Sequence, residues 1–225
     1  MTFNLGIIIA KGSPLVGAAG VTVLITLASL ALGMLIGVVV CAMQRSGKSA
    51  LVYPAVAYVA VFRTIPEMVL IFWIYFCMPA VTGLTLSGIA SGCIALGLAS
   101  GAYLAEIYRG GIEAVPLQQH EAGQALGLPT WLLWVKVILP QAVRFMVPPF
   151  MNYFTELLKN TTLVAAIGVA ELAYAAYALG GQTFRYLEFM TAIGVIYFAI
   201  IFPIGRYAIV IERKLNPGQT FGHTR

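Results

Sequence analysis

Long runs without a charged residue dominate this chain, and they limit what it can fold into. The run Leu15–Met43 contains no Asp, Glu, Lys or Arg. A helix needs about 20 mostly apolar residues to cross a bilayer, and in lipid every backbone polar group has to be bonded within the protein. Such a run therefore favours a membrane-spanning α-helix. The whole chain is 60% hydrophobic and 9% charged, whereas soluble domains are about 25% charged, so the composition indicates a polytopic membrane protein.

Five runs are long enough to cross a bilayer, and a sixth, shorter run precedes the last of them. We predict spans at 15–43, 51–79, 86–105, 131–158 and 187–211. The sixth run, Leu163–Leu179, is rich in Ala and Gly and contains Glu171. These features favour a re-entrant segment or a helix packed inside protein at membrane depth. We therefore expect one all-α membrane domain over residues 1–225 with five transmembrane helices.

Basic residues in the short loops predict the orientation of the chain. The loops on one side hold the larger set, Arg45, Lys48, Arg109, Arg213 and Lys214. The opposite loops hold Lys11, Lys159 and Arg185. Lys and Arg are enriched in cytoplasmic loops. The bias places the N-terminus outside, the C-terminus in the cytoplasm and the loop at 113–130 in the cytoplasm.

The second span contains a predicted break. Pro66 has no backbone donor and disfavours helix at Ile65, so the span is kinked or broken there. Glu67 follows immediately, and an ionisable residue at membrane depth is costly enough to suggest a function. The alternative for Glu67 is an ion pair with Arg63, which shares its helix face if the helix persists through the break.

Several classes of chemistry are disfavoured. The stretch Ala42–Ser49 resembles the nucleotide-binding pattern G-x-x-x-x-G-K-[ST], but Ala42 replaces the first Gly and no strand precedes it. The cysteines lie in apolar runs without metal-ligand spacing, and no nucleophile–base pair is evident. The basic residues punctuate apolar runs and do not form a nucleic-acid-binding cluster. We expect no catalytic residue, no metal site and no bound nucleotide or other cofactor on this chain, so active transport needs a partner or an ion gradient.

Residues 116–130 predict a short helical hairpin between the third and fourth spans. Pro116 suits the start of a helix, and Gly127 suits a left-handed C-terminal cap. Pro129 prevents the helix from continuing, and Thr130 is suited to cap a second helix that starts at Trp131.

Small residues in the first helix of this hairpin, Ala122, Gly123 and Ala125, suggest that a partner approaches closely. The alternative from the residues alone is a plain connecting loop.

The hairpin resembles the EAA signature of ABC-importer permeases. Glu121-Ala122-Gly123, Gly127 and Val137-Ile138-Leu139-Pro140 follow its spacing, with Gly123 in place of the third-position Ala and Val137 in place of Ile. Further stretches resemble the polar amino-acid branch, which handles histidine, arginine, glutamine, glutamate and opines: Phe62–Pro66, Tyr103–Ile112, Lys159–Leu163 and Ile167–Leu172. The resemblance spans roughly residues 15 to 215.

This resemblance implies a type I ABC importer permease, with five transmembrane helices and a cytoplasmic EAA coupling hairpin. The coupling residues would be Glu121, Ala122, Gly123 and Gly127, inserted into a cleft on a separate ATPase subunit that binds ATP and Mg²⁺. Two permeases, identical or paralogous, would form a pore in the bacterial inner membrane. Two ATPase subunits and an extracytoplasmic substrate-binding protein complete the assembly. The chain would work by alternating access and would not itself be an enzyme.

The expected substrate pathway comprises Arg63, Glu67, Tyr103, Glu156, Asn160 and Thr161. An acid at position 67 resembles branch members that move basic amino acids or arginine-derived opines, and a carboxylate attracts a cationic group. The alternative substrate is glutamate or glutamine, with Glu67 paired internally. For Glu156 the alternative is an ion pair with Lys159, and we expect Glu106 and Arg109 to pair at a helix end.

Two other functional classes remain open from the residues. An ion-coupled secondary transporter works without an ATPase, but it would need no docking hairpin and usually shows repeated halves. A purely structural membrane scaffold would not need the set of motifs described above. Both alternatives are therefore less favoured than the importer permease.

Overall fold

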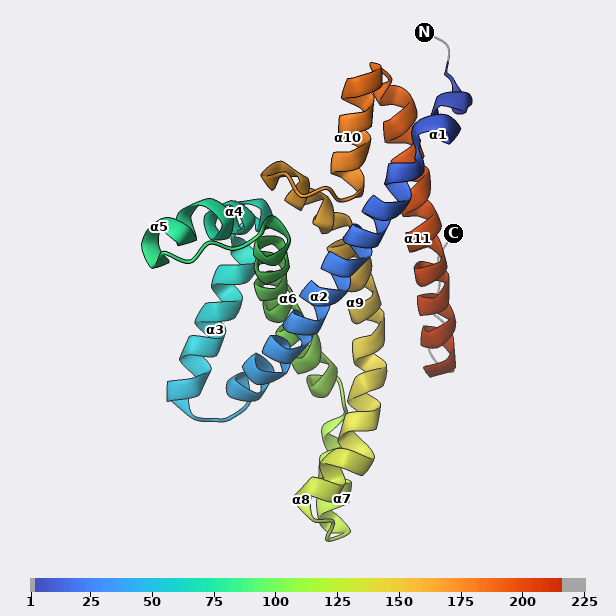
Figure 1. The fold of residues 1–225 in the computed structure, drawn as a ribbon. Coiled ribbons are helices and arrows are strands. Elements are labelled where there is room, and N and C mark those ends of the chain that lie inside the picture. The colour runs from blue at the N-terminus through green and yellow to red at the C-terminus, as the bar shows by residue number, and fades with distance from the viewer. Residues whose placement is uncertain (1–2, 216–225) are drawn as a thin grey trace.

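The computed structural model describes residues 3–215 as a bundle of helices, and no strand occurs within that range (Figure 1). Here η1 and η2 are π-helical turns and η3 is a 3₁₀ helix. The elements in chain order are α1 (Leu5–Lys11), α2 (Ser13–Gln44), α3 (Ser49–Thr64), α4 (Glu67–Phe72), η1 (Trp73–Cys77), α5 (Met78–Thr82), α6 (Gly88–Glu113), α7 (Leu117–Ala125), α8 (Thr130–Leu133), η2 (Trp134–Ile138), α9 (Leu139–Asn160), η3 (Thr161–Ile167), α10 (Leu172–Thr183) and α11 (Tyr186–Leu215).

The expected five-span all-α fold is confirmed. By length and composition, four helices suit a membrane span, and a fifth is obtained if one bent pair is counted as a single span. The bent pair is Ser49–Thr64 with Glu67–Thr82, whose axes differ by 101°. The predicted break at Pro66 is therefore confirmed, and α4 begins directly after the proline.

Helix α2 packs along α6 through small residues on both helices. Gly33 and Gly37 lie on α2, and Gly97 and Gly101 lie on α6. A Cβ added to any of these four glycines would collide with the opposite helix. Small residues four positions apart allow two membrane helices to approach closely. These glycines therefore form the centre of the bundle.

The predicted ends of two segments need correction. Helix α6 continues eight residues beyond Ala105, to Glu113. Arg109 pairs with Glu106 at 2.6 Å and with Glu113 at 2.7 Å, and such pairs one turn apart favour helix beyond the apolar run. The run before the last span is not one helix: η3 ends at Ile167, the next residue Gly168 has a φ of +80°, and α10 starts after Glu171.

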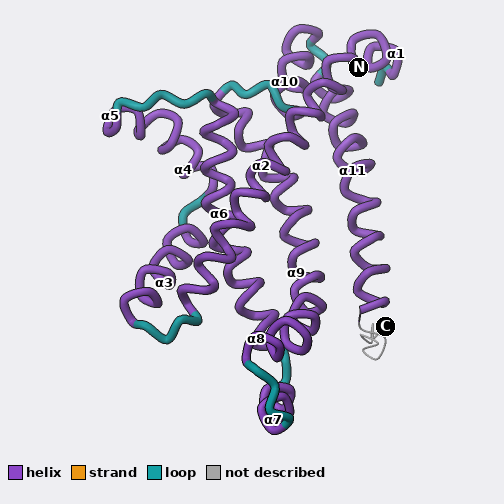
Figure 2. Tube along the Cα trace, turned by 60° about the horizontal axis from the view of Figure 1, so that its bottom comes forward, coloured by secondary structure: helices purple, strands orange, loops and turns teal. Residues whose placement is uncertain are grey.

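The hairpin of α7 and α8 projects from one end of the bundle, which we call the hairpin end (Figures 1 and 2). Helices α1 and α10 lie at the opposite end, which we call the far end. Helix α11 runs beside α9 from the far end toward the hairpin end. The side chains of Arg213 and Lys214, on which the predicted orientation partly rests, lie outside the described residues.

Candidate functional site

The turn of the hairpin follows the predicted capping pattern at its centre. Gly127 has a φ of +68°, and its N–H donates to the Gln124 carbonyl at 2.9 Å. The N–H of Leu128 donates to the Gly123 carbonyl at 3.1 Å, which completes a left-handed C-terminal cap on α7. The prediction for Thr130 was wrong, because α8 begins at this residue, after Pro129, and no side chain caps it.

The predicted coupling residues differ in exposure. Glu121 and Ala122 are exposed on α7, and none of the described hydrogen bonds or ion pairs involves Glu121. Gly123 is buried, and a Cβ there would collide with Leu133 of α8. The absence of a side chain at Gly123 therefore allows α7 to pack on α8. The close approach of a partner to the small residues of α7 stays a prediction.

The hairpin is anchored to the bundle through Trp134, the first residue after α8. The His120 ring meets the Trp134 ring edge to face, with ring centres 5.9 Å apart. The Arg45 guanidinium lies over the same indole, 5.6 Å from its centre. A cation over an aromatic face is attracted by the ring's quadrupole. The hairpin is thus in contact with the end of α2.

A second site lies at the break in the second span. Glu67 is the first residue of α4, and Asn160, the last residue of α9, lies beside it. The Oε2 atom of Glu67 is buried and has no hydrogen-bond partner among the described residues. The carboxylate of Glu156 on α9 is close enough to repel that of Glu67. We call Glu67, Glu156 and Asn160 the Glu67 cluster.

The alternative ion pair between Arg63 and Glu67 is not formed. Arg63 instead lies 3.9 Å from the Glu106 carboxylate and 5.2 Å from the centre of the Tyr103 ring. The four-residue spacing places two side chains on one face only in a continuous helix, and the 101° bend separates these two.

The other residues that the sequence predicted for the substrate pathway do not form a single site. Tyr103 stacks on Tyr153 of α9 with ring centres 5.1 Å apart, beside Arg63. Thr161 is buried, and its hydroxyl donates to the Leu158 carbonyl at 2.8 Å. The suggested Glu156–Lys159 pair is absent from the described ion pairs. Glu106 and Arg109 are paired as predicted.

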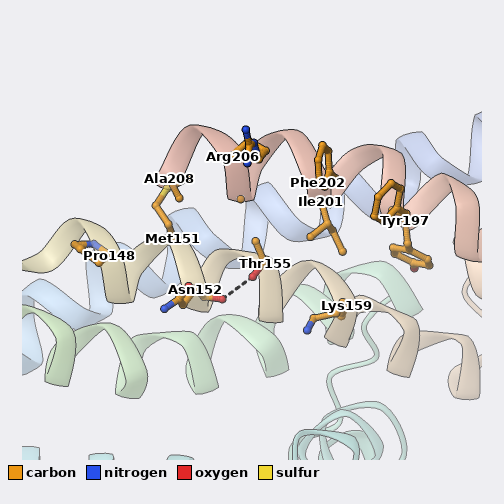
Figure 3. Close-up of a pocket in the computed structure, with 12 residues that line it drawn as sticks. Pro148, Met151, Asn152, Thr155, Lys159, Tyr197, Ile201, Phe202, Arg206 and Ala208 are labelled. Carbon is orange, nitrogen blue, oxygen red and sulfur yellow. Dashed lines mark hydrogen bonds between the residues drawn. The ribbon is translucent and has the colours of Figure 1, made fainter. Parts of the chain in front are cut away.

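A groove of about 860 Å³ runs between α9 and α11 (Figure 3). Asn152, Thr155 and Lys159 line it from α9, and Phe202 and Arg206 line it from α11. The sequence interpretation missed Arg206. An ionisable residue inside a predicted span is costly, and this signal, which identified Glu67, also applies to Arg206 in the span 187–211. The groove has two cations and no acid among its lining residues.

Comparison with known proteins gives consistent matches. The family described as "Binding-protein-dependent transport system inner membrane component" matches residues 29–217. A probable amino-acid ABC transporter permease protein, YckA of Bacillus subtilis, is 33% identical over 94% of this chain and 93% of its own length. The arginine transport system permease protein ArtQ of the same organism is 31% identical over 87% and 90% of the two chains. The glutamine transport system permease protein GlnP of Escherichia coli is 33% identical over 90% and 93%.

A solved structure agrees with these relatives. The crystal structure of an amino acid ABC transporter with histidines aligns with a TM-score of 0.89 and 29% identity, and covers 95% of this chain and 100% of that one. The similarity extends over nearly the whole length of both chains, including the hairpin. The chain therefore belongs to the family of binding-protein-dependent transport system inner membrane components, multi-pass permeases of ABC importers, and its relatives lie in the polar amino-acid branch of that family.

Proposed function

We propose that this permease imports a basic amino acid or an opine-like compound. The observation that carries the proposal is the Glu67 cluster, in which a buried carboxylate oxygen has no partner. A second carboxylate, Glu156, lies nearby and is not ion-paired. Burying a charged oxygen without a partner is costly, and a second carboxylate nearby adds repulsion between like charges. A guanidinium or ammonium group on the substrate removes that cost, because it supplies both the charge and the donors that the cluster lacks.

Glutamine is the second candidate substrate. The relative from Escherichia coli is named for glutamine transport, and the Asn160 amide is suited to bond a substrate amide. Glutamate is less favoured for this cluster, because a third carboxylate would be repelled by Glu67 and Glu156.

The exposed part of α7 is proposed as the contact with the ATPase. Glu121 and Ala122 lie on the outer surface of the projecting hairpin, while Gly123 and Gly127 give the hairpin its shape. ATP and Mg²⁺ bind to the two ATPase subunits and not to this chain. Hydrolysis there moves the hairpins and drives alternating access of the spans.

A second permease, a copy or a paralogue, is proposed to cover the exposed side of α9. Asn152, Glu156 and Lys159 are exposed on this helix, which lies within a candidate span. Charged side chains at membrane depth are costly when they face lipid. A pore between two permeases gives these side chains water and polar partners.

The proposed orientation places the hairpin end in the cytoplasm and the far end outside. It follows from the excess of basic residues at the hairpin end, where Arg45 and Arg109 lie. The N-terminus then lies outside and the C-terminus in the cytoplasm. The substrate-binding protein docks at the far end.

The direct test is uptake by the full complex in proteoliposomes. The two permeases, the two ATPase subunits and the binding protein are reconstituted, and ATP-dependent uptake of labelled arginine, glutamine and glutamate is measured. We expect arginine to be taken up fastest and glutamate slowest. Preferred uptake of glutamine would favour the second candidate. Uptake that persists without the ATPase subunits would contradict the importer and favour an ion-coupled transporter.

A further inference from the structure

Four side-chain contacts and one backbone link, between the neighbouring residues Gln44 and Arg45, join the hairpin to the break in the second span. In order from the hairpin the residues are His120, Trp134, Arg45, Gln44, Glu106 and Arg63, and we call them the coupling path. Rotations of the hairpin have to reach the spans through packed side chains or through the backbone. This line is therefore a candidate for that transmission, and the contacts along it have different strengths.

The hairpin half of the path joins α7 to the end of α2. His120 lies on α7, and Trp134 opens the π-helical turn after α8. Arg45 caps α2, and its guanidinium lies over the face of Trp134. Arg45 and Gln44 are neighbours at the end of a 32-residue helix. A displacement of Trp134 is therefore passed directly to the end of α2.

The second half of the path meets at Glu106. The Gln44 amide donates to Glu106 Oε1 at 3.0 Å, which joins α2 to α6. Arg109, on the same helix, donates to Glu106 Oε2 at 2.6 Å. Arg63 lies 3.9 Å from that oxygen and joins α3 to α6. Glu106 is thus the residue at which three helices meet.

The contact between Glu106 and Arg63 is the adjustable one. The other two partners of Glu106 form hydrogen bonds, whereas 3.9 Å is too long for a hydrogen bond and leaves only charge attraction. Arg63 is the second-last residue of α3, just before the break, and Glu67 follows on the other side. A shift of α3 by about 1 Å toward or away from α6 would turn this contact into a hydrogen bond or abolish it.

The path also continues toward the Glu67 cluster. Arg63 lies over Tyr103, which stacks on Tyr153 of α9. The Tyr153 hydroxyl donates to Ser100 at 2.8 Å and lies close enough to Glu67 and Glu156 to feel their charge. The position of Arg63 is therefore linked to both sides of the proposed substrate site.

We infer that Glu106 is a positioning residue for coupling, which transmits movement of the hairpin through Gln44 to Arg63 and thereby to the break beside the Glu67 cluster. The inference rests on the proposed function, in which the hairpin receives its movement from the ATPase. Its specific content is that loss of the Glu106 charge separates ATP hydrolysis from transport. It does not require Glu106 to touch substrate or ATPase.

The test compares Glu106→Gln with Glu113→Gln in the reconstituted complex. Both variants remove a carboxylate that pairs with Arg109, but only Glu106 also contacts α2 and α3. We expect ATP hydrolysis by Glu106→Gln to stay within about twofold of wild type. Arginine uptake should fall roughly tenfold, which is the effect of losing one charged contact. Glu113→Gln should keep the wild-type number of arginines transported per ATP. A wild-type number of arginines transported per ATP in Glu106→Gln would overturn the inference.

A second pair of variants keeps the inference testable if Glu106→Gln fails to assemble. Trp134→Phe keeps an aromatic face for Arg45, and Trp134→Ala removes it. We expect the number of arginines transported per ATP to fall in Trp134→Ala. In Trp134→Phe this number should lie between the Trp134→Ala and wild-type values, because a phenyl ring attracts a cation less strongly than an indole does. Equal ratios in these two variants and wild type would overturn the inference. A wild-type complex with no ATP-driven uptake would instead contradict the proposed function.

Discussion

Asn160, the last residue of α9, lies beside Glu67, the first residue of α4. This contact closes the break in the second span against a different helix. One oxygen of the Glu67 carboxylate, Oε2, stays buried without a hydrogen-bond partner among the described residues. The free oxygen is the feature that a cationic substrate group satisfies in the proposed function.

Replacing Asn160 by Ala should weaken substrate binding in the membrane without removing it. The Glu67 cluster loses its one amide, which is suited to bond a charged substrate group, and a hydrogen bond to a charged group contributes about 1.5–3 kcal/mol. We expect the concentration of arginine for half-maximal uptake to rise about tenfold or more. The measurement is the concentration dependence of uptake in proteoliposomes. Gln141→Ala serves as the control, because Gln141 lies on the same helix near the hairpin, where its amide donates to the Val137 carbonyl.

Replacing Gly123 by Ala should destabilise the hairpin although it lies in a helix. A Cβ at Gly123 collides with Leu133, and overpacking costs about 1–3 kcal/mol. Gly110 on α6 is the matched control, because a Cβ there meets nothing within 4 Å and Ala favours a helix over Gly. Thermal unfolding in detergent should show a lower midpoint for Gly123→Ala and an unchanged or higher one for Gly110→Ala. The double variant with Leu133→Ala should recover part of the loss; equal midpoints for the two single variants would contradict the packing described.

Reversing the charge of Glu121 should affect assembly and not folding. The side chain is exposed and takes part in none of the described hydrogen bonds or ion pairs. We expect Glu121→Lys to reduce co-purification of the ATPase subunits several-fold, because a charge of the wrong sign in an interface is strongly unfavourable. The unfolding midpoint of the permease alone should stay the same. Retention of the full amount of ATPase would remove Glu121 from the docking surface.

Features of the fold that depend on neighbouring residues could be predicted from the sequence. Pro66 lacks a backbone donor and disfavours helix at Ile65, and Gly127 adopts a left-handed conformation without strain.

Features that depend on how helices are placed in space could not be predicted. The partner of Arg63 depends on the angle of the bend, and the angle separates it from Glu67 and leaves Glu106 within reach. The contact between Asn160 and Glu67 joins residues far apart in the chain. The packing of Gly123 on Leu133 depends on how the hairpin closes, so the sequence could not predict it.

The most direct test of the central claim is arginine uptake by the Glu67→Gln variant in the complete complex. Glutamine has nearly the same shape as glutamate but lacks the charge, so folding and ATPase assembly should be unaffected. Loss of one charged contact to the substrate predicts a fall in arginine uptake of roughly ten- to a hundredfold. Glu188→Gln is the control, since Glu188 lies in the first turn of α11 and pairs with Arg185 at 2.9 Å. Wild-type arginine uptake by Glu67→Gln would contradict the account and exclude Glu67 from the substrate site.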